Sequence, residues 1–136
     1  MNRKRITPSR RASWRAGFPI LVLILAGGGC GGQSARPSDP GEGRKALQAM
    51  LDAWKGGQKP DILAQQTPAI HAFDGDWKSG HVLQNYRADD EGTLVGSDLS
   101  YSVDLELKTP RGKVTKKTAV YAVTTHPQLM VLRQNE

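Results

Sequence analysis

The chain has a single cysteine, Cys30, among its 136 residues, so no disulfide can form within one molecule. Aromatic residues are few, with two phenylalanines, three tyrosines and three tryptophans. Long apolar runs are also missing: the run at residues 18–26 includes Pro19, whereas a membrane-spanning helix needs about 20 apolar residues. We therefore expect a fold stabilised by packing alone, and an apolar run too short to span a bilayer.

Several catalytic motifs are absent as well. The sequence has no Gly-x-Ser-x-Gly elbow, no phosphate-binding Walker loop, and no Gly-x-Gly-x-x-Gly fingerprint after a predicted strand. The lone cysteine precedes the region predicted to fold, which argues against a Cys/His catalytic pair. We predict no catalytic residue, no cofactor and no enzymatic activity.

The positive charge of the chain lies in its first 29 residues. The formal net charge is +6, and six of the 19 basic residues precede Cys30 without any acidic residue among them. The other 13 basic residues and all 13 acidic residues lie in residues 30–136, which are therefore formally neutral. That part has no basic stripe for phosphate contacts, so we predict no nucleic-acid partner.

Residues 1–29 have the order of an export signal. The basic segment is followed by the apolar run and then by three glycines, as small residues precede a cleavage site. We therefore predict a signal peptide at 1–29. Ser9, Arg10 and Arg11 partly match a twin-arginine signal, so the export route stays open.

Cys30, directly after this signal, is the predicted lipidation site. Gly29 is the small residue expected before a lipidated cysteine, although Gly27 stands where such motifs usually have a branched apolar residue. A lipid also accounts for a lone thiol in an exported chain, where exposed free thiols are unusual. We expect a cell-envelope protein anchored to a membrane through Cys30 and facing the periplasm or exterior. A secreted soluble protein is the alternative.

After Cys30 the sequence predicts a tether and one domain. Residues 30–41 are rich in glycine, serine and proline, which is typical of a flexible tether. Residues 42–136 suit one small domain. It begins with an amphipathic helix at 42–56, capped through Asp39 and Glu42 and ended by two glycines. The apolar face of this helix consists of Leu47, Met50, Leu51 and Trp54.

A short second helix is predicted at 60–65, and the following residues have strand patterns. The clearest strand is 99–108, where apolar and polar side chains alternate. Further strands are predicted at 81–88, 113–124 and 129–133, with a short extended segment at 70–73. Short connections favour an antiparallel meander of about four strands. With the helix packed on this sheet, the fold class is α+β.

Three groups of polar residues are candidates for chemistry. The first group is His71, Asp74, Asp76 and His81, which could ligate a metal. Its aspartates are typical turn formers, and Asp76 is expected to start one helical turn, so no metal site is predicted.

The second group, the acidic residues 89–91, is expected at a solvated hairpin tip. The third group is expected to form pairs between strands on the exposed face of the sheet and consists of Asp104 and Glu106 with Lys113, Lys116 and Lys117.

The chain resembles small bacterial lipoproteins of unassigned activity, most like those of planctomycetes. The resemblance is carried by the basic leader and by segments 25–32, 46–56, 76–80 and 109–113. It implies an exported, membrane-anchored protein with a non-enzymatic structural or binding domain. The helix-then-meander order is also similar to cystatin-like and NTF2-like topologies, which suggests the alternative of a small NTF2-like enzyme or ligand-binding domain.

Such an enzyme would need a pocket of several hundred Å³ between helix and sheet, with a desolvated carboxylate directed into it. The inner-facing residues of 99–108 are apolar and are expected to fill this space. Trp54 and Trp77 are expected to pack there as core residues. We therefore expect no polar group on the inner face.

Overall fold

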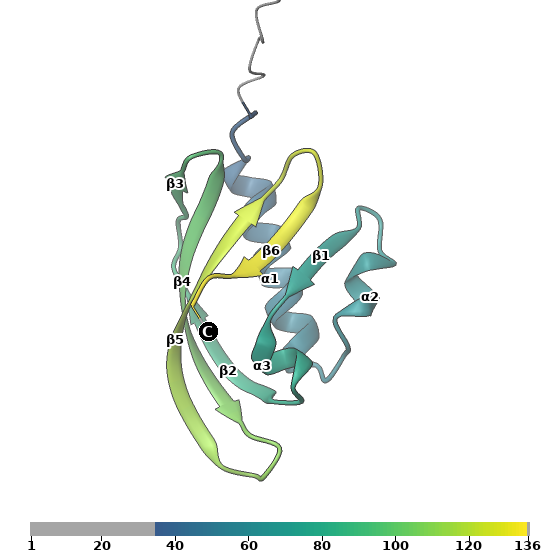
Figure 1. Ribbon diagram of the computed structural model, residues 1–136, viewed down its shortest axis with the longest axis vertical. Helices are drawn as coiled ribbons and strands as arrows, with labels where there is room; N and C mark the ends of the chain where they lie inside the picture. The colour runs from purple at the N-terminus through teal and green to yellow at the C-terminus, as the bar shows by residue number, and fades with distance from the viewer. Residues whose placement is uncertain (1–34, 136) are drawn as a thin grey trace, which may run out of the picture. The chain divides into compact units, whose positions relative to one another are not determined.

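The computed structural model describes residues 35–135, whose helices and strands are shown in Figure 1. The helices are α1 (Pro40–Lys55), α2 (Asp61–Ala64) and α3 (Gly75–Lys78). The strands are β1 (Ile70–Phe73), β2 (Val82–Ala88), β3 (Thr93–Val95), β4 (Asp98–Lys108), β5 (Val114–Thr124) and β6 (Leu129–Arg133). Among these residues, no helix is long and apolar enough to cross a membrane. The predicted signal peptide and Cys30 lie outside the described residues.

The predicted amphipathic helix is α1. Asp39 caps its N-terminus, because its Oδ1 accepts a hydrogen bond from the Glu42 N–H at 2.8 Å. Gly56 and Gly57 end it, and Gly57 has a φ of 76°, which glycine adopts without strain. The predicted apolar face is confirmed, since Leu47, Met50, Leu51 and Trp54 are all buried.

The strands form one mixed sheet in the order β1-β6-β5-β4-β2, with β3 also paired to β4. Figure 1 shows the sheet curled into a half-barrel, and α1 contacts its inner side. The α+β class is confirmed, as is the short helix predicted at 60–65, which is α2. The expected architecture of a single helix on an antiparallel meander of about four strands is wrong, because the mixed sheet has six strands and α3 is a further short helix. β4, β5 and β6 are antiparallel neighbours as predicted, whereas β1 joins β6 in parallel. Alternation within a segment predicts a strand but does not identify the strand beside it.

The prediction of a hairpin tip at 89–91 is also wrong. β2 and β3 both pair with β4, so these residues link two strands that lie along one side of it. The sequence pattern does not predict β3, because all three of its residues are exposed and none alternates with a buried one. In the link, Asp90 forms an ion pair with Arg44 of α1 and its side chain is 93% exposed.

The predicted tether, 30–41, extends too far into the domain. Ser38 is buried, its N–H donates to the Ser97 carbonyl at 2.8 Å, and its hydroxyl accepts a hydrogen bond from the Thr125 N–H at 3.0 Å. The Asp39 N–H donates to the Thr125 hydroxyl at 2.9 Å. The chain is therefore attached to the sheet from Ser38 onward, at the end where α1 begins.

The hydrophobic core lies between α1 and the inner face of β4 and β5. The alternation predicted for 99–108 is confirmed, since its odd-numbered residues are buried. Tyr101 lies opposite Tyr121 across these strands, and both are at most 1% exposed. Burying a large apolar side chain of this kind contributes about 1.5–3 kcal/mol to stability.

Gly92 provides a test of this packing, because an added Cβ would lie 2.6 Å from Cζ of the buried Tyr101 ring. Replacing Gly92 by alanine should lower the free energy of unfolding by about 1–3 kcal/mol, as overpacking does. Urea denaturation measures the change, with the exposed neighbour Glu91→Ala as control. Equal midpoints for Gly92→Ala and the unchanged protein would contradict the close contact.

Candidate functional site

A buried carboxylate joins α3 to the sheet. Asp74 follows β1 and caps α3, with its Oδ1 accepting a hydrogen bond from the Trp77 N–H at 3.0 Å. Its Oδ2 accepts a hydrogen bond from the Tyr121 hydroxyl at 2.6 Å and lies 3.4 Å from Arg133 Nη1. The Asp74 side chain is fully buried, and that of Arg133 is 4% exposed. Both carboxylate oxygens of Asp74 are therefore occupied by groups of this chain.

Asp76 extends the cluster on the same side of the sheet. Its Oδ2 lies 2.5 Å from Arg133 Nη1 and 2.5 Å from Lys117 Nζ. Burial alone would raise the pKa of Asp76, but hydrogen bonds and positive charges from Lys117 and Arg133 outweigh this effect and hold the pKa below its usual value. Burial and the neighbouring Asp74 raise the pKa of Tyr121, so its hydroxyl stays protonated and donates to Asp74.

These contacts correct three predictions. The cap of the short helix is Asp74 rather than Asp76. Lys117 lies opposite the buried Leu105, on the inner face, and not with Lys116 on the exposed face. The inner face therefore does carry polar groups. Because Lys116 and Lys117 are adjacent and both polar, alternation could not show which of them faces inward; the pairing with β4 decides it.

A cavity of about 920 Å³ adjoins the cluster. It lies between the α1–α2 link, the end of β1, α3 and the start of β2. Trp54 and Trp77 line it and stack with their ring centroids 5.7 Å apart. Their indole N–H groups donate to the carbonyls of His81 and Gln58, at 2.7 and 2.9 Å. Both tryptophans are buried as predicted, and they also form part of a cavity wall.

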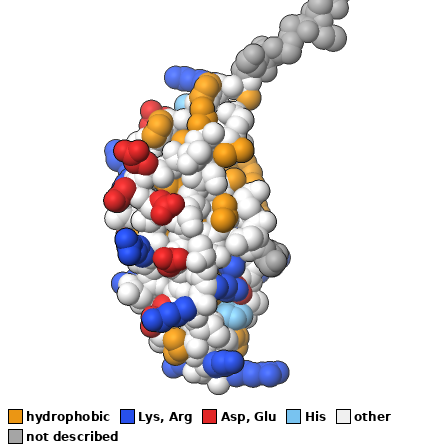
Figure 2. Space-filling model, turned by 90° about the vertical axis from the view of Figure 1, so that its left-hand side faces the viewer, with side chains coloured by type: hydrophobic (Ala, Val, Ile, Leu, Met, Phe, Trp, Pro, Cys, Tyr) orange, Lys and Arg blue, Asp and Glu red, His pale blue; other side chains and the backbone are white. Residues whose placement is uncertain are grey.

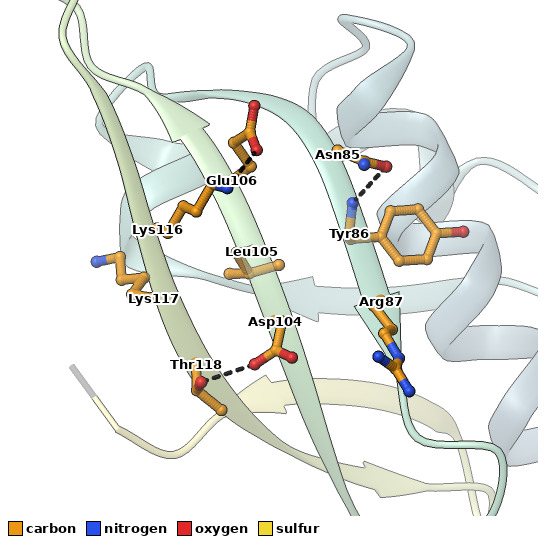
Figure 3. A pocket seen from close by; sticks show the side chains of 9 residues that line it. All are labelled: Asn85, Tyr86, Arg87, Asp104, Leu105, Glu106, Lys116, Lys117 and Thr118. Carbon is orange, nitrogen blue, oxygen red and sulfur yellow. Dashed lines mark hydrogen bonds and ion pairs between the residues drawn. The ribbon is translucent and has the colours of Figure 1, made fainter.

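A second, smaller hollow of about 390 Å³ lies on the outer face of β2, β4 and β5 (Figure 3). Here Glu106 is 3.6 Å from Lys116, and the Thr118 hydroxyl donates to Asp104 at 2.7 Å, so the predicted pairing between strands is confirmed for Glu106. Acidic and basic side chains are interspersed on the side of the molecule shown in Figure 2. Paired charges of both signs give this face no preference for a charged ligand.

Tyr86 lines the same hollow, but its ring points toward α1 (Figure 3). Its hydroxyl donates to Asp52 Oδ1 at 2.6 Å. Burial and the Asp52 carboxylate raise the pKa of Tyr86 to about 12, so this phenol is not a base at neutral pH. It connects β2 to α1.

The structure brings only part of the candidate metal group together. Asp74 and Asp76 both contact Arg133, and His81 Nε2 lies 3.9 Å from Asp76 Oδ1, whereas His71 lies on β1 opposite Met130. Within residues 35–135, no three His, Cys, Asp or Glu side chains are gathered so that they could hold a metal ion. Cations of the chain itself occupy the positions beside the two carboxylates.

Sequence reasoning missed a contact between Ser79 and His81. The Ser79 hydroxyl lies 3.0 Å from His81 Nδ1 and donates to the Asp76 carbonyl at 3.1 Å, and His81 Nε2 lies 3.9 Å from Asp76 Oδ1, so the three residue types of a catalytic triad adjoin one another without its hydrogen bonds. The backbone N–H groups of residues 78–81 all donate to carbonyls in or next to α3. They cannot form an oxyanion hole, which acyl transfer requires. Short local spacing, Asp-x-x-Ser-x-His, is the signal that could have identified this contact.

Comparison with models of protein families, with curated proteins and with solved structures found no match to this chain. The site is therefore interpreted from its own geometry.

Asp74 should be essential for stability. Asp74→Ala removes the cap of α3 and leaves the buried Arg133 without one partner, which should cost about 3 kcal/mol or more in the free energy of unfolding. Tyr121→Phe removes one hydrogen bond to a buried carboxylate and should cost about 1.5–3 kcal/mol. Urea denaturation at neutral pH compares them, with Asp90→Ala as an exposed control. A smaller loss for Asp74→Ala than for Tyr121→Phe would contradict the role assigned to Asp74.

Asp76 should contribute to the pH dependence of stability. Its pKa is lowered by folding, so the unfolded chain binds more protons in acid, and the stabilisation is complete above the unfolded pKa of about 4. It is lost as the pH falls through the folded pKa. Asp76→Asn should therefore be less stable than the unchanged protein at pH 7, with a difference that shrinks below about pH 4. Urea midpoints across this range test the prediction, and a constant difference would refute it.

Proposed function

We propose that this chain is an exported lipoprotein, anchored through Cys30, whose domain binds a small molecule in the cavity beside Trp54 and Trp77. The leader and the lone cysteine after it support the anchor. The cavity supports a binding role, because its volume of about 920 Å³ lies within the range of small-molecule sites. The proposal includes no cofactor, and its partners are a membrane and a small molecule.

The observation that carries this proposal is the separation of the two ends of α1. The chain joins the fold at Ser38, just before the start of α1, the helix labelled in Figure 1. The cavity is lined by Trp54 and Gly57, at and just beyond the other end of this helix. A helix of 16 residues is about 24 Å long. The eight steps of the chain from Cys30 to Ser38 reach at most about 29 Å. An anchor at Cys30 would thus be joined to the domain at the Ser38 end of α1, whereas the cavity lies at the other end of this helix.

Binding is favoured over catalysis by the state of the polar groups beside the cavity. Asp74 is a desolvated carboxylate that lines the cavity, as an NTF2-like enzyme would need, but its oxygens are engaged by Trp77, Tyr121 and Arg133. A general base needs an oxygen within reach of the substrate proton. The Ser79–His81 contact is the observation that favours an enzyme as the second candidate, and the missing oxyanion donors argue against it.

The anchor can be tested on protein from the membranes of its native host. Mass spectrometry should find a mature N-terminus at Cys30, blocked and lipid-modified. Cys30→Ser should move the protein from the membrane fraction to the soluble fraction, whereas the matched control Ser34→Ala should stay in the membrane. An intact Met1 on protein in the cytosol would overturn the proposal.

A further inference from the structure

The charges around the cavity are not balanced. Lys59 and Lys78 line it from the α1–α2 link and from α3, and both are exposed. Neither forms an ion pair with any residue of 35–135. The carboxylates in the lining are Asp61 and Asp74, and Asp74 is already paired with Arg133. The lining therefore has two lysines without an ion pair within residues 35–135 and one carboxylate, that of Asp61, outside the cluster.

Arg133 adds hydrogen-bond donors to the same cavity wall. Its Nη1 contacts Asp74 and Asp76, and its Nε donates to the Asn135 carbonyl at 2.9 Å. The side-chain hydrogen bonds of Arg133 within residues 35–135 come from Nε and Nη1, and none comes from Nη2. A guanidinium carries five N–H donors, so the two on Nη2 are not used in these contacts, and the contacts of Nη1 and Nε hold the group in the cavity wall, where its side chain is 4% exposed.

Apolar side chains complete the cavity. Phe73 and Val82, which also line it, are 59% and 48% exposed and so are open to contact by a ligand. The stacked Trp54 and Trp77 form a further apolar part of the lining. A ligand that covers Phe73 and Val82 gains from removing apolar surface from water, whereas the buried tryptophans shape the wall.

We propose that the cavity binds a small organic anion, with its carboxylate, sulfonate or phosphate near Lys59, Lys78 and Arg133 and its apolar body against Phe73, Val82 and the tryptophans. This inference rests on the binding function proposed above and specifies the chemistry of the ligand. Charge-assisted hydrogen bonds to the anion provide orientation, and the apolar contacts provide most of the affinity.

Two fluorescent probes with the same rings separate the two contributions. The full chain is titrated with 1-anilinonaphthalene-8-sulfonate, which is anionic, and with N-phenyl-1-naphthylamine, which lacks the sulfonate. Exchanging both Lys59 and Lys78 for glutamine should lower the affinity for the anionic probe about fivefold, because two exposed charge contacts are lost. The affinity for the neutral probe should fall less than twofold. The matched control exchanges Lys45 and Lys113, two exposed lysines outside the cavity lining, for glutamine and should change neither affinity.

The indole N–H signals in a nitrogen–proton NMR spectrum locate the binding. The signals of Trp54 and Trp77 should shift when the anionic probe binds. The anion inference fails, and the proposed binding function stands, if only the neutral probe shifts the signals of Trp54 and Trp77. The same holds if exchanging Lys59 and Lys78 lowers the affinity for both probes equally. If neither probe shifts these signals, both proposals fail.

Discussion

The fold depends on the burial of one carboxylate. Asp74 connects three parts of the chain that are distant in sequence, because it caps α3, accepts the hydroxyl of Tyr121 on β5 and contacts Arg133 on β6. This attachment fixes α3 over one end of the inner face. α3 in turn carries Trp77, which stacks on Trp54 of α1. The position of α3 against the sheet, and with it one wall of the cavity, thus depends on a polar contact beside the apolar core.

Such a contact is stable only when every member is satisfied. A buried ion pair loses hydration, and the attraction between its charges repays this cost only with good geometry and further hydrogen bonds. Here Tyr121 and the Trp77 N–H supply those bonds to Asp74, and Lys117 shares Asp76 with Arg133. Among residues 35–135, no buried side-chain nitrogen or oxygen lacks a hydrogen-bond partner. The same saturation leaves Asp74 no free oxygen for catalysis, while Arg133 keeps donors beside the cavity.

Local patterns in the sequence were sufficient for the elements that bury one face. The odd-numbered residues of 99–108 alternate with polar ones, and the apolar residues of α1 recur at helical spacing, so both elements were predicted within two residues of their observed ends. β3 was not predicted, because its three residues are all exposed and show no alternation of buried and exposed side chains. The candidate site was predicted only in part: Asp74 and Asp76 were named, whereas Lys117 was assigned to the wrong face and Arg133 was not considered.

The sequence by itself determined the division between a basic leader and a neutral remainder, the lone Cys30 at their boundary, and the helix and strands of the core. These properties depend on composition or on neighbours a few residues apart. The tertiary structure alone decided that β1 lies beside β6, that Lys117 faces inward, and that Asp74 meets Tyr121 and Arg133. Each of these depends on which strands pair and in which register, a choice made by the whole core during folding and not by any single segment.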